Sequence, residues 1–158
     1  MTTPTIKAAG EGERRWFYGG GIHTWKVTEA DSAGSISMFE DVMTEGKNTP
    51  WHCHPHSDEV AYLVEGECRV KVGDDERVVG AGASWFVPRG TEHAFTVLSP
   101  TARILAIQTP GTAGRFYWEA SEPAGEQDGA VDFARIGEVA RSTGITDLLG
   151  PPPFALDR

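Results

Sequence analysis

Short apolar segments separated by turn-forming residues fill the chain from about residue 14 to residue 110. The segments are rich in Val, Ile, Phe, Tyr, Trp and Thr, and glycines and prolines divide them from one another. Because β-branched and aromatic side chains suit a pleated, half-buried surface, this pattern is typical of an antiparallel all-β domain. It predicts strands at residues 21–27, 35–43, 59–64, 68–72, 76–79, 84–87, 94–98 and 103–108.

Two turn sequences indicate that neighbouring strands pair directly. Glu65-Gly66 and Gly73-Asp74-Asp75 supply residues that accept a positive φ or bond their own backbone, as short hairpins require. The strands on either side of each turn are therefore expected to form consecutive antiparallel pairs. No segment repeats another, which favours a single barrel over a doubled one.

The composition changes after residue 110. Residues 111–130 hold small and acidic residues around the aromatic trio Phe116, Tyr117 and Trp118. We expect this segment to be a connector that packs against the barrel through its three rings.

A helix is expected near the end of the chain. Between residues 131 and 141 the apolar residues recur at steps of three and four, which predicts one amphipathic helix. Asp132 is expected to cap its start, and Gly144 is expected to end it.

Length and composition favour one compact domain. A chain of 158 residues can bury a core without disulfides. We expect a single domain over residues 1–158, with the barrel at about 14–110 and the connector and helix at 111–158. No apolar run approaches the roughly 18 residues of a membrane span, and the first residues lack the apolar core of a secretory signal. These features predict a soluble, cytoplasmic protein with no membrane partner.

Charge and cysteine content narrow the choice of partners. A formal net charge of −9 would repel a phosphate backbone, and no cluster of Lys and Arg offers a local exception. Nucleic acid is therefore not an expected partner. The only two cysteines, Cys53 and Cys68, are expected to be reduced thiols, as is usual inside cells.

Candidate metal ligands occur in two short segments. His52 and His54 are two residues apart, so both project from the same face of a strand, and Glu59 can return to them from the next strand. His93 begins a further strand after a Pro/Gly turn. Three neutral imidazoles and a carboxylate suit a divalent transition ion, Fe, Mn, Ni, Co, Cu or Zn, and leave coordination positions open.

These residues stand at the spacing of a known pair of motifs. The pattern G-x5-H-x-H-x4-E-x6-G is matched by Gly46, His52, His54, Glu59 and Gly66. The pattern G-x5-P-x-G-x2-H is matched by Gly82, Pro88, Gly90 and His93, while Val97 stands where the second motif usually ends in Asn. The chain thus resembles the cupin superfamily. This resemblance implies a double-stranded β-helix, or jelly-roll barrel, that holds one metal ion near one end and is commonly a homodimer.

The C-terminal segment extends the resemblance to a smaller group. Residues 108–111, 116–117, 122–124 and 150–154 are similar to the tail of small bacterial cupins named for quercetin dioxygenase. That resemblance implies an enediol or flavonol-like small-molecule substrate whose carbon–carbon bond is cleaved with O2. Glu59 would then act as the base. The alternative is a non-oxidative cupin, such as an isomerase, a decarboxylase or a binding protein, because the fold and the ligands do not select the reaction.

Strand alternation predicts the walls of the pocket. Ala61 and Leu63 share the inward side of Glu59, and Phe95 and Val97 share that of His93. With valine at 97 the wall is apolar, which favours a substrate with an aromatic or aliphatic body over a sugar.

The remaining candidates have structural interpretations. His56 falls in the loop after Pro55, Cys53 points away from the metal, and His23 has no companion ligand nearby. For Trp51, Trp85 and Phe86 core packing is favoured over a place in the pocket.

Overall fold

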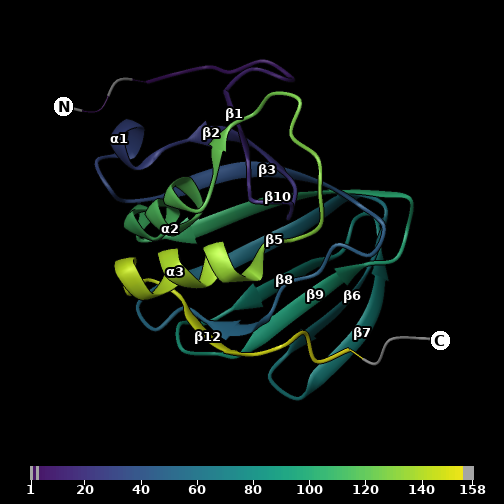
Figure 1. Cartoon of the computed structure of the whole chain (residues 1–158). Coiled ribbons are helices and arrows are strands. Elements are labelled where there is room, and N and C mark those ends of the chain that lie inside the picture. The colour runs from purple at the N-terminus through teal and green to yellow at the C-terminus, as the bar shows by residue number, and fades with distance from the viewer. Residues whose placement is uncertain (1, 3, 155–158) are drawn as a thin grey trace.

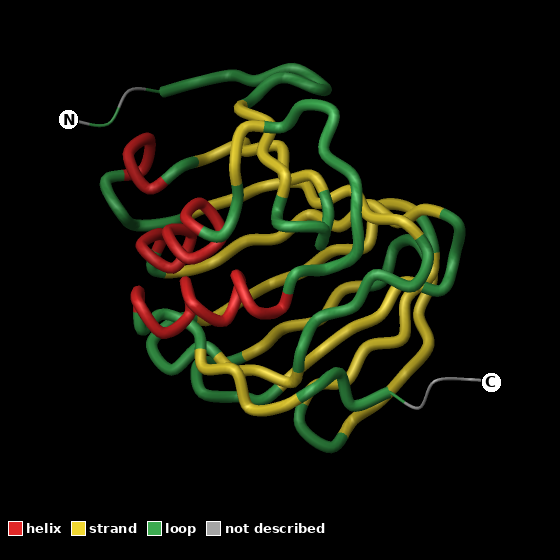
Figure 2. Tube along the Cα trace, in the orientation of Figure 1, coloured by secondary structure: helices red, strands yellow, loops and turns green. Residues whose placement is uncertain are grey.

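The structure is a computed structural model that describes residue 2 and residues 4–154. The remaining positions of the expected 1–158 domain, residues 1, 3 and 155–158, lie outside the described residues. Two antiparallel sheets face each other, and the helices gather on one side of them (Figures 1 and 2). The all-β jelly-roll class predicted from the sequence is confirmed.

The larger sheet has seven strands in the order β11-β1-β2-β3-β10-β5-β8. Their bounds are β1 Glu13–Trp16, β2 Ile22–Val27, β3 Ser37–Thr44, β5 Asp58–Glu65, β8 Ser84–Val87, β10 Thr101–Thr109 and β11 Glu122–Pro123. The smaller sheet has five strands in the order β12-β4-β9-β6-β7. Their bounds are β4 Trp51–Cys53, β6 Glu67–Val72, β7 Asp75–Gly80, β9 His93–Val97 and β12 Asp147–Gly150.

Every strand predicted from the apolar segments is present, and no end is shifted by more than two residues. Of the two direct pairings predicted from turn sequences, the one around Gly73 is confirmed, since β6 and β7 pair antiparallel. The other is wrong, because the turn at Gly66 leads from β5 in the larger sheet to β6 in the smaller sheet. This turn also shows why the motif requires glycine. Gly66 has φ 94°, and a Cβ there would collide with the carbonyl oxygen of Thr101. A side chain at this position would therefore be both strained and obstructed.

Three helices and a 3-10 turn complete the described chain: α1 Glu29–Ser32, η1 Gly111–Ala113, α2 Gly114–Glu119 and α3 Phe133–Thr143. The predicted caps of α3 are confirmed. The Asp132 side chain accepts a hydrogen bond from the Arg135 backbone N–H, and Gly144 ends the helix at φ 64°. The predicted connector contains α2, which carries the aromatic trio. No helix in the described part of the chain combines the length and apolarity needed to cross a bilayer.

The segment after β10 also completes both sheets. Strand β11 pairs with β1, and β12 pairs with β4, so that Leu148 lies opposite His52. Helix α3 packs beside α2 and covers a cluster of buried side chains that is separate from the cluster between the sheets (Figure 1). The C-terminal segment thus closes the end of the barrel that holds the histidines.

Candidate metal centre and its cavity

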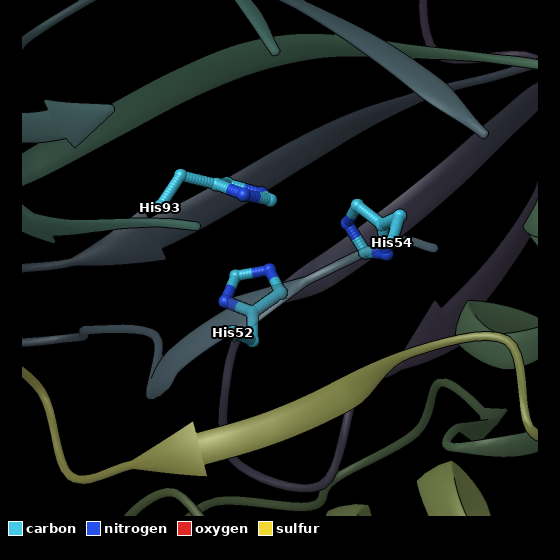
Figure 3. Close-up of side chains that lie close together, drawn as sticks. All are labelled: His52, His54 and His93. Atoms are coloured by element: carbon cyan, nitrogen blue, oxygen red, sulfur yellow. The ribbon is translucent and has the colours of Figure 1, made fainter. Parts of the chain in front are cut away.

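Three histidines meet between the sheets. His52 on β4 and His93 at the start of β9 are cross-strand partners, and His54 follows β4 on the same side as His52. One nitrogen of each ring lies within 4.8 Å of the others (Figure 3). All three side chains are buried. The sequence motif therefore brings together three imidazoles at a separation that one metal ion can bridge.

Hydrogen bonds to carbonyl groups fix the tautomers of two of these rings. His52 Nδ1 lies 2.8 Å from the Pro50 carbonyl oxygen, and His93 Nδ1 lies 3.0 Å from that of Thr91. A carbonyl oxygen only accepts, so each Nδ1 carries the proton and each Nε2 presents its lone pair. Outer hydrogen bonds of this kind orient metal-binding imidazoles. In both rings Nε2 is therefore the nitrogen available to a metal ion.

Glu59 on β5 faces two of the three histidines. Its Oε2 lies 3.2 Å from His54 Nε2, and its Oε1 lies 3.7 Å from His93 Nε2. The carboxylate is 8% exposed and reaches the centre from the sheet opposite β4 and β9. The structure thus places all four predicted ligands in one buried group.

The Tyr117 hydroxyl was not identified as part of the site from the sequence, yet it contacts this group directly. It donates to Glu59 Oε2 at 2.9 Å and lies 3.3 Å from His54 Nε2. Helix α2 presents Tyr117 to the barrel, so the aromatic connector contributes a polar atom to the centre. No sequence pattern indicated this role, because Tyr117 lies 58 residues from Glu59.

A second polar chain also supports Glu59. Ser37 Oγ donates to Gln108 Oε1 at 2.9 Å, and Gln108 Nε2 lies 3.5 Å from Glu59 Oε2. These residues lie opposite one another on β3, β10 and β5. Both Ser37 and Gln108 are buried, so these two hydrogen bonds orient the carboxylate away from competing water.

The electrostatics favour neutral His52 and His93 in the same group as an ionised carboxylate. Burial, followed by the neighbouring imidazoles, lowers the pKa of His52 well below 6.5, and burial lowers the pKa of His93. Burial opposes ionisation of Glu59, but its hydrogen bond and charge interactions with the histidines hold its pKa below the ordinary value. Burial, then the charge of Glu59, raises the pKa of Tyr117, which stays a neutral donor.

The residues present fit a divalent transition ion. Nε2 of His93 is buried and has no hydrogen-bond partner among the described residues, which is unfavourable unless something binds there. Three imidazole nitrogens and a carboxylate oxygen are a donor set that Fe, Mn, Ni, Co, Cu and Zn accept. His52, His54, His93 and Glu59 are therefore the residues that would hold such an ion.

The centre opens into a cavity whose lining is mainly apolar. Its walls come from both sheets, from α2 and from α3, and include Phe39, Ile104, Phe116 and Ile136. Of the four predicted wall residues, Ala61 and Phe95 line this cavity.

The other two predicted wall residues lie in the core. Leu63 and Val97 belong to the buried cluster between the sheets, with Met43 and Ile104. Alternation predicted correctly that both side chains point inward, and both are buried, but neither lines the cavity. An inward-pointing side chain can therefore belong either to the packed core or to the cavity wall, and strand alternation does not distinguish the two.

The other singled-out residues lie outside the cavity lining. His56 is exposed in the loop after β4, and Trp51 donates to Glu92 at 2.9 Å. Trp85 packs against the core cluster, whereas Phe86 is 57% exposed, so its expected core packing is wrong. Cys53 is a free, half-buried thiol whose pKa is raised, first by burial.

His23 does have a companion. It is 1% exposed on β2, its Nε2 lies 3.5 Å from Asp41 Oδ2 on β3, and both residues line the cavity. The sequence suggested a structural histidine without neighbours that carry chemistry. The antiparallel register of β2 and β3, which sequence spacing did not reveal, makes His23 and Asp41 cross-strand partners.

Comparison with known proteins agrees with this fold. Residues 39–107 match the family model described as a cupin domain. An uncharacterised protein of Streptomyces coelicolor is 35% identical over 57 residues, which cover 35% of this chain and 54% of that protein. This match spans only about half of the relative's length.

Solved structures with the same fold differ widely in what they are named. KdgF from Halomonas sp. aligns with a TM-score of 0.62 at 18% identity, over 68% of this chain and 94% of its own. An RmlC-like cupin from Shewanella frigidimarina aligns with a TM-score of 0.60 at 22% identity, over 70% and 95%. Oxalate decarboxylase from Bacillus subtilis aligns with a TM-score of 0.57 at 22% identity, over 70% and 31%. At these identities the likeness shows the fold.

Proposed function

Because the chain belongs to the cupin superfamily and gathers three histidines and Glu59 in one buried group, we propose that it is a metal-dependent dioxygenase. Its substrate would be a small aromatic or enediol compound, such as a flavonol-like molecule, cleaved at a carbon–carbon bond with O2. The observation that carries this proposal is the buried Glu59 carboxylate, which accepts a hydrogen bond from Tyr117 and lines the mainly apolar cavity.

The ion would be one divalent Fe, Mn, Ni, Co, Cu or Zn, held by His52, His54, His93 and Glu59. When bound, it would take the paired oxygens of the substrate and lower the pKa of a substrate hydroxyl. A redox-active ion is required for the oxidative reaction, so zinc alone would favour a different chemistry.

The protein's own groups orient the substrate and move one proton. Tyr117 and Gln108 both donate toward Oε2 of Glu59. Among the described residues Oε1 receives no hydrogen bond, and it faces His93 Nε2. We assign to Oε1 the acceptance of the substrate's hydroxyl proton. The cavity walls would exclude water and contact the substrate's apolar body.

A non-oxidative cupin is the second candidate, as an isomerase, a decarboxylase or a small-molecule binding protein. The fold supports it, since oxalate decarboxylase from Bacillus subtilis has the same architecture. Metal analysis of protein purified without chelator or nickel resin separates the two candidates. A zinc-only protein that consumes no oxygen with any enediol or flavonol would favour the second.

Glu59→Gln tests the assignment of the base. The substitution keeps the shape and one oxygen donor but removes the proton acceptor, so metal should remain bound while oxygen uptake falls by roughly 10²-fold or more. Glu65→Gln, on the exposed end of the same strand, is the matched control and should leave uptake unchanged. Equal turnover in metal-loaded Glu59→Gln would exclude Glu59 as the base.

We further propose that the chain forms a homodimer through the outer face of the larger sheet. Val60, Tyr62 and Phe86 are neighbours on β5 and β8 and are 38%, 44% and 57% exposed. A contiguous apolar face of this kind supports association. Light scattering should give a dimer for the wild type and a monomer for Phe86→Glu. Val78→Glu, on β7 of the other sheet, should remain dimeric.

We also propose that the chain acts as one domain in the cytoplasm. Strands β11 and β12 complete the two sheets from the C-terminal segment, which supports a single unit. Cys53 and Cys68 are free thiols, which suits a reducing compartment.

A further inference from the structure

The cavity contains a second polar site, away from the four candidate ligands. His23 and Asp41 both line it, and each has a buried polar atom without a hydrogen-bond partner in the described structure, His23 Nδ1 and Asp41 Oδ1. A third buried acceptor of the same lining, Asn48 Oδ1, is also unpartnered. Buried polar atoms are almost always satisfied, so several orphans around one cavity indicate that a ligand completes them.

The local structure explains why these three atoms have no hydrogen-bond partner within the described protein. The imidazole of His23 is stacked between Phe17 and Phe39, at ring-centroid distances of 4.8 and 4.3 Å, so it cannot turn to find a partner. A Cβ at Gly21 would collide with Asp41 Oδ1, so glycine at this position gives the carboxylate oxygen room without providing a hydrogen-bond partner. Nδ2 of Asn48 donates to the Gly46 carbonyl at 3.3 Å, which leaves the Oδ1 acceptor free.

The second site lies within reach of the metal centre. The Tyr117 ring borders both, with its centroid 6.2 Å from that of His54 and 5.9 Å from that of His23. The two histidine rings are thus at most about 12 Å apart, a span that a single substituted ring bound at the centre can approach. The wall between them is aromatic and aliphatic.

We propose that His23 and Asp41 form a second anchor that selects a neutral ligand carrying a hydroxyl group remote from its metal-binding end. The hydroxyl would donate to His23 Nδ1, whose ring faces Asp41 through Nε2. A ligand with a carboxylate at that position would place a second anion beside Asp41 in a desolvated cavity and would be rejected. This inference rests on the proposed metal centre and narrows its substrate class.

Three catechols that differ at one position test the anchor: 4-methylcatechol, 4-(hydroxymethyl)catechol and 3,4-dihydroxybenzoate. Calorimetry with zinc-loaded protein under nitrogen measures binding without oxidation. The hydroxymethyl compound should bind about two- to tenfold more tightly than the methyl compound, as one net hydrogen bond predicts. The carboxylate compound should bind at least about tenfold more weakly than the methyl compound.

Variants assign the preference to the two residues. His23→Phe keeps the stacked ring and should abolish the preference for hydroxymethyl over methyl. Asp41→Asn should strengthen binding of 3,4-dihydroxybenzoate by about tenfold or more. Glu40→Gln removes the same charge from the neighbouring position of β3, whose side chain faces the opposite way, and should leave all three affinities unchanged.

The wild-type ranking alone decides the proposal, even if a variant fails to fold. Equal affinity for the three compounds, tightest binding of the carboxylate or no binding at all would overturn the second anchor. The predicted ranking without oxygen uptake in the redox-metal form would support the anchor and remove the dioxygenase reaction. Failure of the protein to bind zinc would overturn both the metal centre and the anchor.

Discussion

The hydrogen bond from Tyr117 to Glu59 can be tested by removing one oxygen atom. Tyr117→Phe keeps the ring that packs near His23 and Phe39 but deletes the hydroxyl that donates to Glu59 Oε2. The other donor toward this oxygen, Gln108 Nε2 at 3.5 Å, is too distant to compensate fully. The buried carboxylate would therefore lose its principal uncharged donor.

The size of the effect follows from the charge of the acceptor. Hydrogen bonds to charged groups contribute about 1.5–3 kcal/mol to the free energy of unfolding. For a chain of this size 1 kcal/mol shifts the melting temperature by about 2–4 °C, so metal-free Tyr117→Phe should melt about 3–12 °C below the wild type. In metal-loaded protein the difference should shrink, because the ion gives Glu59 a second partner.

Thermal unfolding followed by circular dichroism measures both differences, with and without Zn²⁺. Thr112→Val is the control, since it also removes one hydroxyl, from an exposed residue of η1 outside the larger sheet, and its melting temperature should barely change. If metal-free Tyr117→Phe and Thr112→Val melt together, the Tyr117 hydroxyl does not stabilise Glu59 and the description of the centre is wrong.

Three further predictions concern the metal and the histidines. His52→Ala or His54→Ala should lose most bound metal while the exposed His56→Ala keeps it, as element analysis would show; full occupancy in both ligand variants would refute the site. Removing the metal should lower the melting temperature but leave the far-ultraviolet strand signal intact, because the apolar core cluster that includes Leu63 and Val97 contains none of the candidate ligands. An unfolded apo chain would contradict this. The lowered pKa values of His52 and His93 mean that the unfolded chain binds protons more readily than the folded one. Denaturant midpoints of the metal-free protein should therefore be constant above about pH 6.5 and fall below it, and constant midpoints down to about pH 5 would refute this.

Much of the fold is predictable because its strands alternate cleanly. On β5 the buried Glu59, Ala61 and Leu63 alternate with the exposed Val60 and Tyr62. This period of two is a local property of the sequence, and every strand with a sufficient run of it was predicted.

The missed elements are too short to carry a period. Strand β11 has two residues, and β1 and β12 have four each. Helices α1 and α2 have four and six residues, which is fewer than two helical turns. Their stability comes from partners distant in the sequence, such as β4 for β12. Local pattern therefore identified the aromatic residues of α2 as packing groups without showing that they form a helix.

The candidate site likewise has a part that local sequence predicts and a part that depends on residues distant in the sequence. His52 and His93 each bond the carbonyl two residues earlier, so the motif contains both the ligand and the group that sets its tautomer. Tyr117 and Gln108 reach Glu59 across 58 and 49 residues, and no spacing rule connects them. The candidate ligands were thus predictable, whereas the groups that hold the Glu59 carboxylate in place were not.

Val97 shows how the chain accommodates its one departure from the two motifs. The Val97 backbone N–H donates to the Lys47 carbonyl at 2.8 Å, and the Gly46 N–H donates to the Val97 carbonyl at 3.0 Å. These bonds join the end of the second motif to the start of the first, and any residue except proline can make them at position 97. The side chain is 1% exposed within the core cluster, where valine packs without a polar group to satisfy. The backbone at position 97 therefore joins the two motif segments, and the Val97 side chain packs in the apolar core.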